Sequence, residues 1–419
     1  MKHFGIYGYG FPVDEHWLKN PVVKNSILEL QNLPLGEAAV FSEKVLARFI
    51  EEDQRHGNSR LLDAGNRSLR SFSSGEKRKV LLNYLLQQNP DILIVDSPFD
   101  NLDRQSVEEL KITLKDISKG TSIIQFFKRK EDLLPIIDKV IRIENEKIGK
   151  VYTTEEFIAE SASEEIRDQL KSIPPAPGEF KNIPKSLMKL EDVSVKYEDR
   201  PILTNISWEV IKGEFWKLTG PNGSGKTTIL SMIYGDNPKA YGENVFLFGN
   251  RKGSGETVWE IKKKIGYFSP ALTELFSRRN TALEMLISGL VDSIGLYQRP
   301  TDKQVALAKQ WLKTLNLEHR QNKIFIKLPL LEQRLLLIGR AMIKHPPLLI
   351  LDEPTTALDD ESAMKIINLI NLIAAESNSA VIYVSHRKEK GLKPDFHFEL
   401  IPSDKGSVGK IEASGLRSG

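Results

Sequence analysis

The sequence predicts an α/β fold in which two related domains follow one another along the chain, and two observations support this. The first is an internal repeat: the segment 89–106 (NPDILIVDSPFDNLDRQS) aligns without gaps with the segment 345–362 (HPPLLILDEPTTALDDES), at an offset of 256 residues. The second is the order of the elements. In each copy an apolar run is followed by a helical stretch and a second apolar run, over 92–127 in the first and 348–385 in the second. Strands that alternate with helices indicate a parallel sheet in each copy.

The composition is that of an ordinary globular protein. Of 419 residues, 40% are hydrophobic and 27% are charged, and the net charge of +3 gives no support for a nucleic-acid partner. Because the chain has no cysteine, disulfides, thiolate zinc sites and cysteine nucleophiles are excluded, and a bound metal would have oxygen ligands. No apolar run reaches the ~20 residues that cross a bilayer, and the start of the chain lacks the apolar core of a secretion signal. We therefore expect a cytoplasmic protein. If it has a membrane partner, it would lie at the inner face of the membrane.

A phosphate-binding loop is the most specific motif of the chain. The string GPNGSGKTT has the spacing G-x-x-x-x-G-K-[ST], between the strand-like run EFWKLT and the helical run TILSMIY. Glycines let the backbone wrap around phosphate oxygens, Lys226 reaches the β- and γ-phosphates, and the Thr227 hydroxyl is a ligand for Mg²⁺. The alternative, a glycine-rich turn with a chance lysine, is disfavoured by the strand–loop–helix context. The expected nucleotide-binding residues are Gly220, Pro221, Asn222, Gly223, Ser224, Gly225, Lys226, Thr227 and Thr228.

Two further segments supply groups for phosphate chemistry. In LLILDEP a buried strand ends at Asp352, expected to bind Mg²⁺, and at Glu353, expected to polarise the attacking water. His386 follows the next strand-like run, where an imidazole could contact the γ-phosphate; a lone histidine is more often incidental, but beside the other motifs we assign it a catalytic role with Glu353 and Lys226. Tyr197 precedes the loop, and its ring either stacks on adenine or is an ordinary strand aromatic.

Together these residues resemble the ATP-binding cassette (ABC) ATPases, which have a P-loop NTPase fold, and the resemblance covers nearly the whole chain as two cassettes in tandem. In that family two cassettes sandwich ATP, and a signature loop of the opposite cassette completes each site. The first copy contains such a signature, FSSGEKR, whose expected nucleotide contacts are Ser73, Ser74 and Gly75. The resemblance implies an ATPase that uses ATP and Mg²⁺, with one site built from the phosphate loop and acidic pair of cassette two and the signature of cassette one.

The second composite site is expected to be degenerate. At the offset of 256, its signature falls on LPLLEQR, where Pro329 replaces the serine and Leu331 the glycine. In the first copy Ser97 replaces the catalytic glutamate, and Lys128 stands near the position of the histidine. The same offset places the first phosphate loop before Met1, so we expect the first cassette to lack this loop and to be incomplete at its N-terminus.

The domain boundaries follow from these motifs and from local composition. Proline-containing and polar segments mark a linker, and the glycine-rich end of the chain predicts a flexible tail. We expect a first cassette at 1–150, a helical and proline-containing linker at 151–185, a second cassette at 186–405 and a tail at 406–419.

Longer strings narrow the resemblance. YEDRPILTNISWEV and GSGETVWEIKKKIGY resemble the tandem-cassette proteins found with bacterial molybdate-transport genes, the ModF type. Besides a soluble tandem ATPase, two alternatives stay open: the energising subunit of a transporter with a separate permease, and an ATP-dependent switch like the tandem-cassette translation factors. Most ABC cassettes carry a glutamine where this chain has Ser269 and Pro270, which weakens the case for a permease partner. The sequence names neither a transported substrate nor a protein partner.

Overall fold

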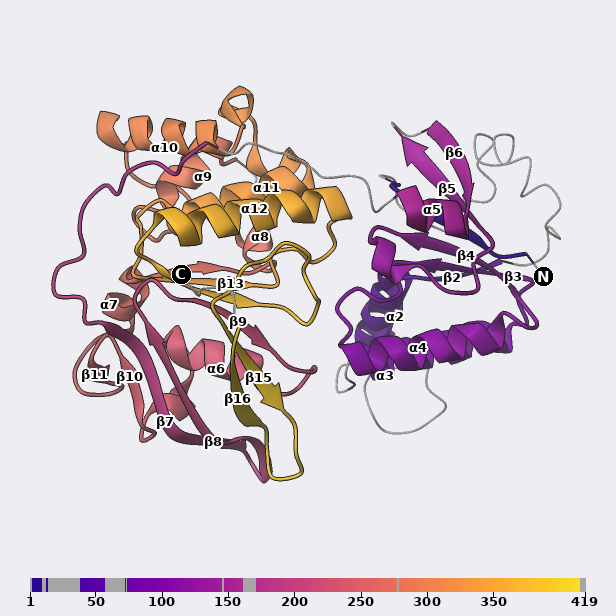
Figure 1. The fold of residues 1–419 in the computed structure, drawn as a ribbon, viewed down its shortest axis with the longest axis horizontal. Coiled ribbons are helices and arrows are strands. Elements are labelled where there is room, and N and C mark those ends of the chain that lie inside the picture. Colours follow the sequence, from indigo (N-terminus) through magenta and orange to yellow (C-terminus); the bar gives the residue numbers. More distant parts are fainter. Residues whose placement is uncertain are drawn as a thin grey trace. The chain divides into compact units, whose positions relative to one another are not determined.

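The computed structural model describes residues 2–9, 13, 38–56, 72, 74–144, 147–160, 171–276 and 279–414. The chain separates into two compact units, each with its own core (Figure 1). Unit 1 comprises Met1–Ile166 with Ala357–Asp360, and unit 2 comprises Arg167–Thr356 with Glu361–Gly419. No helix in the described ranges is both long and apolar enough to span a bilayer.

Unit 1 is built on a six-stranded sheet of order β2-β3-β4-β1-β5-β6, in which only the last pair is antiparallel. Its central strands are buried on both faces, as expected of a parallel sheet covered by helices. The strands are β1 (Phe4–Tyr7), β2 (Ala38–Phe41), β3 (Ile92–Asp96), β4 (Ser122–Phe127), β5 (Lys139–Glu144) and β6 (Lys147–Thr153). The α-helices are α2 (Glu43–His56), α3 (Ser74–Gln87), α4 (Arg104–Ile117) and α5 (Thr154–Glu160).

Unit 2 contains a six-stranded sheet of the corresponding order, β12-β13-β14-β9-β15-β16, and a four-stranded antiparallel sheet, β11-β10-β7-β8. The strands are β7 (Ser186–Tyr197), β8 (Arg200–Ile211), β9 (Phe215–Thr219), β10 (Val245–Leu247), β11 (Asn250–Arg251), β12 (Ile265–Phe268), β13 (Leu348–Asp352), β14 (Ala380–Val384), β15 (Phe396–Ile401) and β16 (Val408–Ala413). The helices are α6 (Lys226–Ile233), α7 (Val258–Lys263), α8 (Leu272–Leu275), α9 (Ala282–Ser288), α10 (Asp302–Thr314), α11 (Leu330–Met342) and α12 (Asp360–Glu376). The described part of unit 1 contains no counterpart of the four-stranded sheet.

Helix α6 lies between the two sheets of unit 2 (Figure 1). Its apolar side chains, among them Ile229 and Ile233, share one core with Trp208 of β8 and with Leu348 and Ile350 of β13. Helices α11 and α12 lie on the other face of the six-stranded sheet, and α9 packs against both α10 and α11. Because α6 is close-packed between the two sheets, the loop before α6 is held in position by both of them.

The register of the two six-stranded sheets corrects one sequence inference. In unit 1, Phe126 pairs with Asp96 on one side and with Ile6 on the other. In unit 2, Val384 pairs in the same way with Asp352 and Leu218, so β1 is the counterpart of β9. The inference that this part of the first copy would fall before Met1 was wrong.

The uniform offset failed because the first copy is shorter between its first strand and its acidic motif. Gly8 occupies the repeat position of Gly220, and 88 residues separate Gly8 from Asp96, against 132 between Gly220 and Asp352. The segment after β1, GYGFPVDE, has neither the lysine nor the hydroxyl residue of a phosphate loop. The loop sequence is therefore absent although its preceding strand is present.

The repeat extends to unusual backbone angles. Ser97 and Glu353, at the same repeat position, have φ of 44° and 49°, and the pair Asn89 and His345 has φ of 48° and 50°. Non-glycine residues seldom adopt this left-handed conformation, which costs about 1–3 kcal/mol where the surroundings enforce it. Two such coincidences at an offset of 256 confirm that the two copies share one fold.

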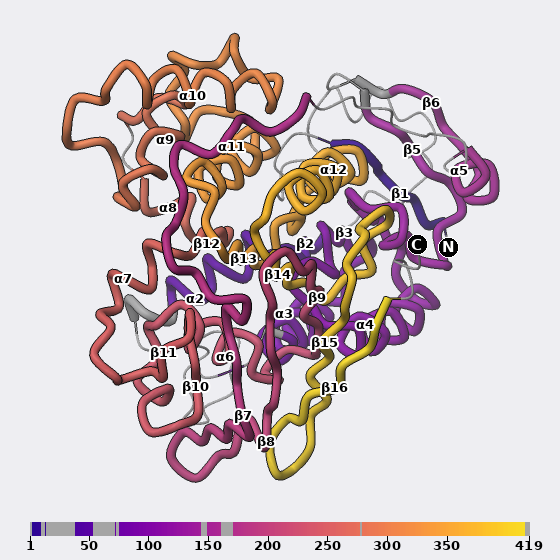
Figure 2. The backbone as a smooth tube through the Cα atoms, turned by 60° about the vertical axis from the view of Figure 1, so that its left-hand side comes forward, coloured from indigo at the N-terminus to yellow at the C-terminus, as the bar shows by residue number. Residues whose placement is uncertain are grey.

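The C-terminal segment 406–419 was predicted to be a flexible tail, and for 408–413 this was wrong. These residues form β16, which pairs antiparallel with β15 along its whole length (Figure 2). All six side chains are exposed, so main-chain hydrogen bonds hold the strand, and a composition-based argument does not detect them. Residues 415–419 lie outside the described residues.

The predicted linker contains ordered segments on both sides of the unit boundary. Its start belongs to β6 and α5, and Phe157 of α5 is buried in the core of unit 1. Its later part lies on unit 2, where Ile173 N donates to Glu376 at 2.8 Å and Thr314 Oγ1 donates to Ser172 O at 3.0 Å. The rest of the predicted helical stretch, 161–170, lies outside the described residues. The domain boundaries at 150/151 and 185/186 stay predictions.

Candidate active site

The glycine-rich loop of unit 2 connects the end of β9 to the start of α6. Gly220 has φ of 152° and Gly225 has φ of 97°. A Cβ atom at Gly220 would lie 2.9 Å from Leu400 O, and one at Gly225 would lie 2.5 Å from Leu203 Cδ2. Both positions therefore require glycine, because the backbone angle is unfavourable for other residues and there is no room for a side chain. The tight loop leaves its amide groups and the helix N-terminus to face an anion.

Lys226 is the first residue of α6, and its ammonium group folds back onto the loop. Its Nζ donates to Gly220 O at 2.7 Å and to Pro221 O at 2.9 Å. Ser224 Oγ is buried and has no hydrogen-bond partner within the described residues. A phosphate group placed in the loop would give the Ser224 hydroxyl a partner and the Lys226 ammonium an opposite charge.

The acidic pair lies at the end of β13, with Asp352 as its last residue and Glu353 directly after it. Burial raises the pKa of Asp352 to about 6, and the charge of Glu353 adds to this effect while Lys226 opposes it. Thr227 lies in the first turn of α6, after the lysine. A buried carboxylate and a hydroxyl are donors suited to Mg²⁺. The described residues contain no group of three His, Cys, Asp or Glu side chains that could hold a metal.

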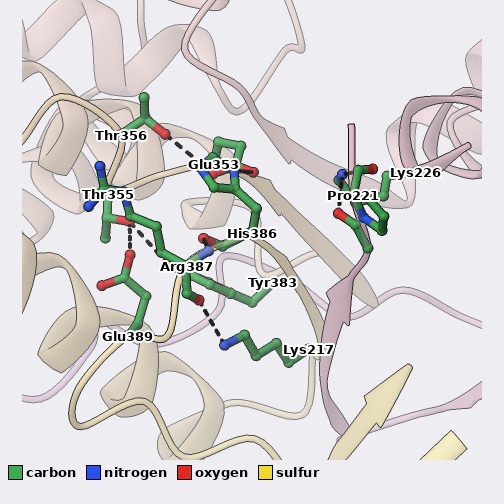
Figure 3. Close-up of polar contacts among 12 residues, drawn as sticks. Lys217, Pro221, Lys226, Glu353, Thr355, Thr356, Tyr383, His386, Arg387 and Glu389 are labelled. Carbon is green, nitrogen blue, oxygen red and sulfur yellow. Dashed lines mark hydrogen bonds and ion pairs between the residues drawn. The ribbon is translucent and has the colours of Figure 1, made fainter. Parts of the chain in front are cut away.

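Glu353 and His386 come from the ends of neighbouring parallel strands, β13 and β14, and their side chains meet (Figure 3). His386 Nδ1 lies 2.9 Å from Glu353 Oε1, and Thr356 Oγ1 donates to Glu353 Oε2 at 3.3 Å. Because a carboxylate accepts, Nδ1 carries the hydrogen, and Nε2, buried without a partner among the described residues, is left to contact a ligand. The structure thus brings together two of the three side chains that the sequence assigned to catalysis.

Tyr197 ends β7 at the rim of unit 2. Its hydroxyl accepts a hydrogen bond from Asn237 Nδ2 at 3.0 Å, and Lys239 Nζ lies 5.9 Å from the ring centroid. The ring is 43% exposed, so one face is open for stacking. These contacts fix the ring, and its proposed role with adenine stays a prediction.

Sequence reasoning missed residues that connect the histidine loop to the glutamate loop and to β9. Thr355 Oγ1 donates to Glu389 Oε1, and Lys217 Nζ donates to Arg387 O at 3.0 Å (Figure 3). Thr355 lies two residues after Glu353, and Glu389 three residues after the histidine. Only these short spacings from the assigned residues could have drawn attention to them in the sequence.

The comparisons with known proteins agree with this geometry. The family described as "ABC transporter" matches residues 203–356. The ABC transporter ATP-binding protein ModF of Escherichia coli is 36% identical over 352 residues, which cover 82% of this chain and 71% of that protein. The chain belongs to the ABC family of ATP-binding proteins. An uncharacterized ABC transporter ATP-binding protein of Schizosaccharomyces pombe is 31% identical, over 77% of this chain and 66% of that protein.

A solved structure extends the likeness to both units of this ABC protein. It is entitled "Model of ribosome-bound archaeal Pelota and ABCE1", and it matches 98% of this chain and 75% of its own with a TM-score of 0.64. At 15% identity this likeness concerns the fold alone. Units 1 and 2 are accordingly called cassette one and cassette two below.

In cassette one, another side chain of the same cassette contacts the acidic motif at Asp96 and Ser97. Tyr9, two residues after β1, donates its hydroxyl hydrogen to Asp96 Oδ1, and its oxygen lies 2.8 Å from Ser97 Oγ. Lys128 Nζ lies 5.6 Å from the centroid of the Tyr9 ring. Burial raises the pKa of Asp96, and the hydrogen bond from Tyr9 acts in the opposite direction. A tyrosine therefore satisfies the carboxylate whose counterpart in cassette two was assigned to Mg²⁺.

In both cassettes a helix begins within the signature segment, at the same repeat position. Helix α3 begins at Ser74, and Gly75 is its second residue, where a Cβ atom would meet no described residue closer than 3.5 Å. Helix α11 begins at Leu330 after Pro329, which has no N–H to offer a phosphate. Ser73 lies outside the described residues.

Proposed function

We propose that this ABC protein binds Mg²⁺·ATP and hydrolyses it at a single site. The observation that carries the proposal is the Glu353–His386 pair, held at 2.9 Å in the cassette whose phosphate loop is intact. In cassette one, Ser97 and Lys128 stand at or near the corresponding positions, and neither offers that chemistry. The loop, the acidic pair and the histidine of cassette two would be completed by Ser73, Ser74 and Gly75 of cassette one.

Each residue has a defined task in this proposal. Lys226 and the loop amides bind the β- and γ-phosphates, and the Tyr197 ring stacks on adenine. Glu353 accepts a hydrogen bond from the attacking water and orients it, while His386, with a hydrogen on both ring nitrogens, donates through Nδ1 to Glu353 and through Nε2 to the γ-phosphate. Bound Mg²⁺ neutralises phosphate charge, and Thr227 and Asp352 are the donors that would hold it.

The second candidate function is that of the energising subunit of a transporter, with a separately encoded permease as its partner. The E. coli relative is named an ABC transporter ATP-binding protein. Cassette two also exposes large apolar side chains near its helices α8 and α9, with Leu275 at 55%, Val291 at 53% and Tyr297 at 84%. Exposed apolar groups of this size favour a protein partner. The third interpretation is an ATP-dependent switch, which has to bind ATP but does not have to hydrolyse it.

The test is ATP turnover and ATP affinity of the full chain and of Glu353→Gln, which keeps the shape of the side chain. The proposal expects kcat to fall by about 10²–10⁴-fold while the Kd for ATP stays within about twofold. Wild-type binding without turnover would favour the switch interpretation. Turnover that is unchanged in Glu353→Gln would remove Glu353 from the mechanism.

A further inference from the structure

The two loops that carry Glu353 and His386 are tied together by a second pair of side chains. Thr355 Oγ1 donates a hydrogen bond to Glu389 Oε1 (Figure 3). One partner belongs to the loop after β13 and the other to the loop after β14. The contact therefore links the two segments at a point away from the catalytic pair itself.

The direction of the hydrogen bonds at Thr355 is fixed by chemistry. Tyr383 OH lies 3.2 Å from Thr355 Oγ1. Because the carboxylate of Glu389 accepts the threonine hydrogen, Tyr383 is the donor to Thr355. Tyr383 and Thr355 are 0% and 1% exposed, so this chain of donors runs from the core of cassette two out to half-buried Glu389. A charged acceptor makes such a bond roughly twice as strong as a neutral one.

The tie lies two residues after a residue in the left-handed conformation. Glu353 has φ of 49°, and its N–H donates to Val384 O at 2.9 Å, across to the strand that leads to His386. A left-handed non-glycine residue persists only where its surroundings enforce it. The Val384 contact fixes the loop before Glu353, and the Thr355–Glu389 bond fixes it after. Both anchor points connect the glutamate loop to the histidine loop.

Cassette one provides an internal comparison. Phe99 stands at the repeat position of Thr355; it is 1% exposed and has no hydroxyl to donate. Cassette one also has Ser97 at the position of Glu353. The threonine donor is thus retained in the cassette that retains the catalytic pair, and lost in the other.

We propose that Glu389 is a positioning residue for ATP hydrolysis, acting through Thr355 to hold Glu353 and His386 at their 2.9 Å separation. This inference rests on the proposed function. In this proposal Glu389 acts through Thr355 and not on the nucleotide, so its loss is expected to change the chemical step and not the binding of ATP. A displacement of about 1 Å in catalytic groups costs on the order of 10²-fold in rate.

The experiment compares four variants of the full chain. Thr355→Val and Glu389→Ala break the bond, whereas Thr355→Ser keeps a hydroxyl and Glu389→Gln keeps an oxygen that accepts. We expect the first two to lower kcat by about 10–100-fold with the Kd for ATP within about twofold, and the second two to recover most of the rate. Equal kcat in Thr355→Val and wild type would overturn the proposal, as would equal losses in Thr355→Val and Thr355→Ser.

A second readout does not need turnover. In the nucleotide-free chain, the imidazole ¹³C–¹H resonance of His386 should shift in Thr355→Val and Glu389→Ala, and stay in place in Thr355→Ser and Glu389→Gln. If wild type hydrolyses no ATP, the proposed function fails, and this resonance still decides whether the bond positions His386. An unmoved resonance in both breaking variants contradicts the inference. Should Thr355→Val not fold, the Glu389 variants decide alone, because Glu389 is only half-buried.

Discussion

Glu353 and His386 lie 33 residues apart in the sequence, yet Glu353 Oε1 and His386 Nδ1 are 2.9 Å apart. Parallel strands β13 and β14 are neighbours in the sheet, so their carboxyl ends deliver both side chains to the same edge. The phosphate loop follows β9, which neighbours β14 on its other side. The topology of the sheet thus gathers the loop, the glutamate and the histidine of cassette two.

Lys226→Ala should abolish ATP binding. The variant removes the ammonium group that serves as counter-charge to the β- and γ-phosphates. No other described lysine donates to the carbonyl groups of Gly220 and Pro221. We expect the Kd for ATP, measured by titration calorimetry, to rise at least about 100-fold. Lys119→Ala, at a lysine that pairs with Asp116 on the surface of cassette one, is the matched control and should bind ATP normally. Retained affinity in Lys226→Ala would refute the assignment of the loop.

Asp352 should make the metal-free protein less stable as the pH rises. Burial raises the folded-state pKa of Asp352 to about 6, against about 3.9 in an unfolded chain. The unfolded chain therefore releases the proton first, and the stabilisation present below about pH 4 is lost by about pH 6. Relative to Asp352→Asn, wild type should lose on the order of 2–3 kcal/mol between pH 4.5 and pH 7.5. Urea unfolding of cassette two in EDTA measures this difference, and parallel pH profiles would contradict it.

Arg334→Met should stabilise cassette two. Arg334 is 5% exposed, its Nε and Nη1 have no hydrogen-bond partner within the described residues, and burial lowers its pKa to about 10. Its guanidinium lies 5.4 Å from the centroid of the Phe268 ring, which compensates only part of the lost hydration. Replacement by an apolar side chain of similar length should raise the free energy of unfolding by about 1 kcal/mol, measured with urea.

The matched variant at the same repeat position should have the opposite effect. Arg78 donates to Pro98 O, to Asp100 O at 2.7 Å and to Glu43 Oε2 at 2.8 Å. Arg78→Met would leave two carbonyl groups without this donor and should destabilise cassette one by about 2 kcal/mol. Effects of the same sign for both arginines would contradict the account of either site.

Tyr9→Phe should weaken cassette one without creating a second ATP site. The variant removes the hydroxyl that donates to half-buried Asp96, so the carboxylate loses a partner and stability should fall by about 1–2 kcal/mol. The segment after β1 still lacks a phosphate-binding lysine, so the number of bound nucleotides should not change. Thermal unfolding and equilibrium dialysis with ATP measure the two effects. A second bound ATP in Tyr9→Phe would show that Tyr9 alone had closed the site.

The sequence predicted the motifs of cassette two because each is a contiguous string with a fixed chemical purpose. The loop 220–228 and the segment ending at Asp352 and Glu353 lie where the strand–loop–helix and strand-end interpretations placed them. The position of β1 was missed because a four-residue strand, FGIY, has little pattern of its own, and a gapless offset cannot accommodate a shorter connection. Strand β16 was missed because its pairing depends on main-chain groups that every sequence has.

The tie between Thr355 and Glu389 could not be predicted for a different reason. Whether side chains of separate loops meet can be judged only when the order and register of the strands are known. No single sequence motif contains both Thr355 and Glu389. The same holds for Tyr9 and Asp96, which lie 87 residues apart in cassette one. Residue identity showed that Ser97 and Lys128 lack the catalytic chemistry, whereas the structure was needed to find what stabilises Asp96.

The most direct test of a single site completed by the first signature is the number of bound ATP molecules per chain, together with turnover, in wild type and in Gly75→Asp. Among the described residues, a Cβ atom at Gly75 would meet nothing closer than Ser106 Oγ at 3.5 Å, and Gly75→Ala serves as the control for size. The account predicts one ATP per chain, and turnover reduced at least about 100-fold in Gly75→Asp because the added carboxylate repels the γ-phosphate. Two bound ATP molecules, or full turnover in Gly75→Asp, would contradict it.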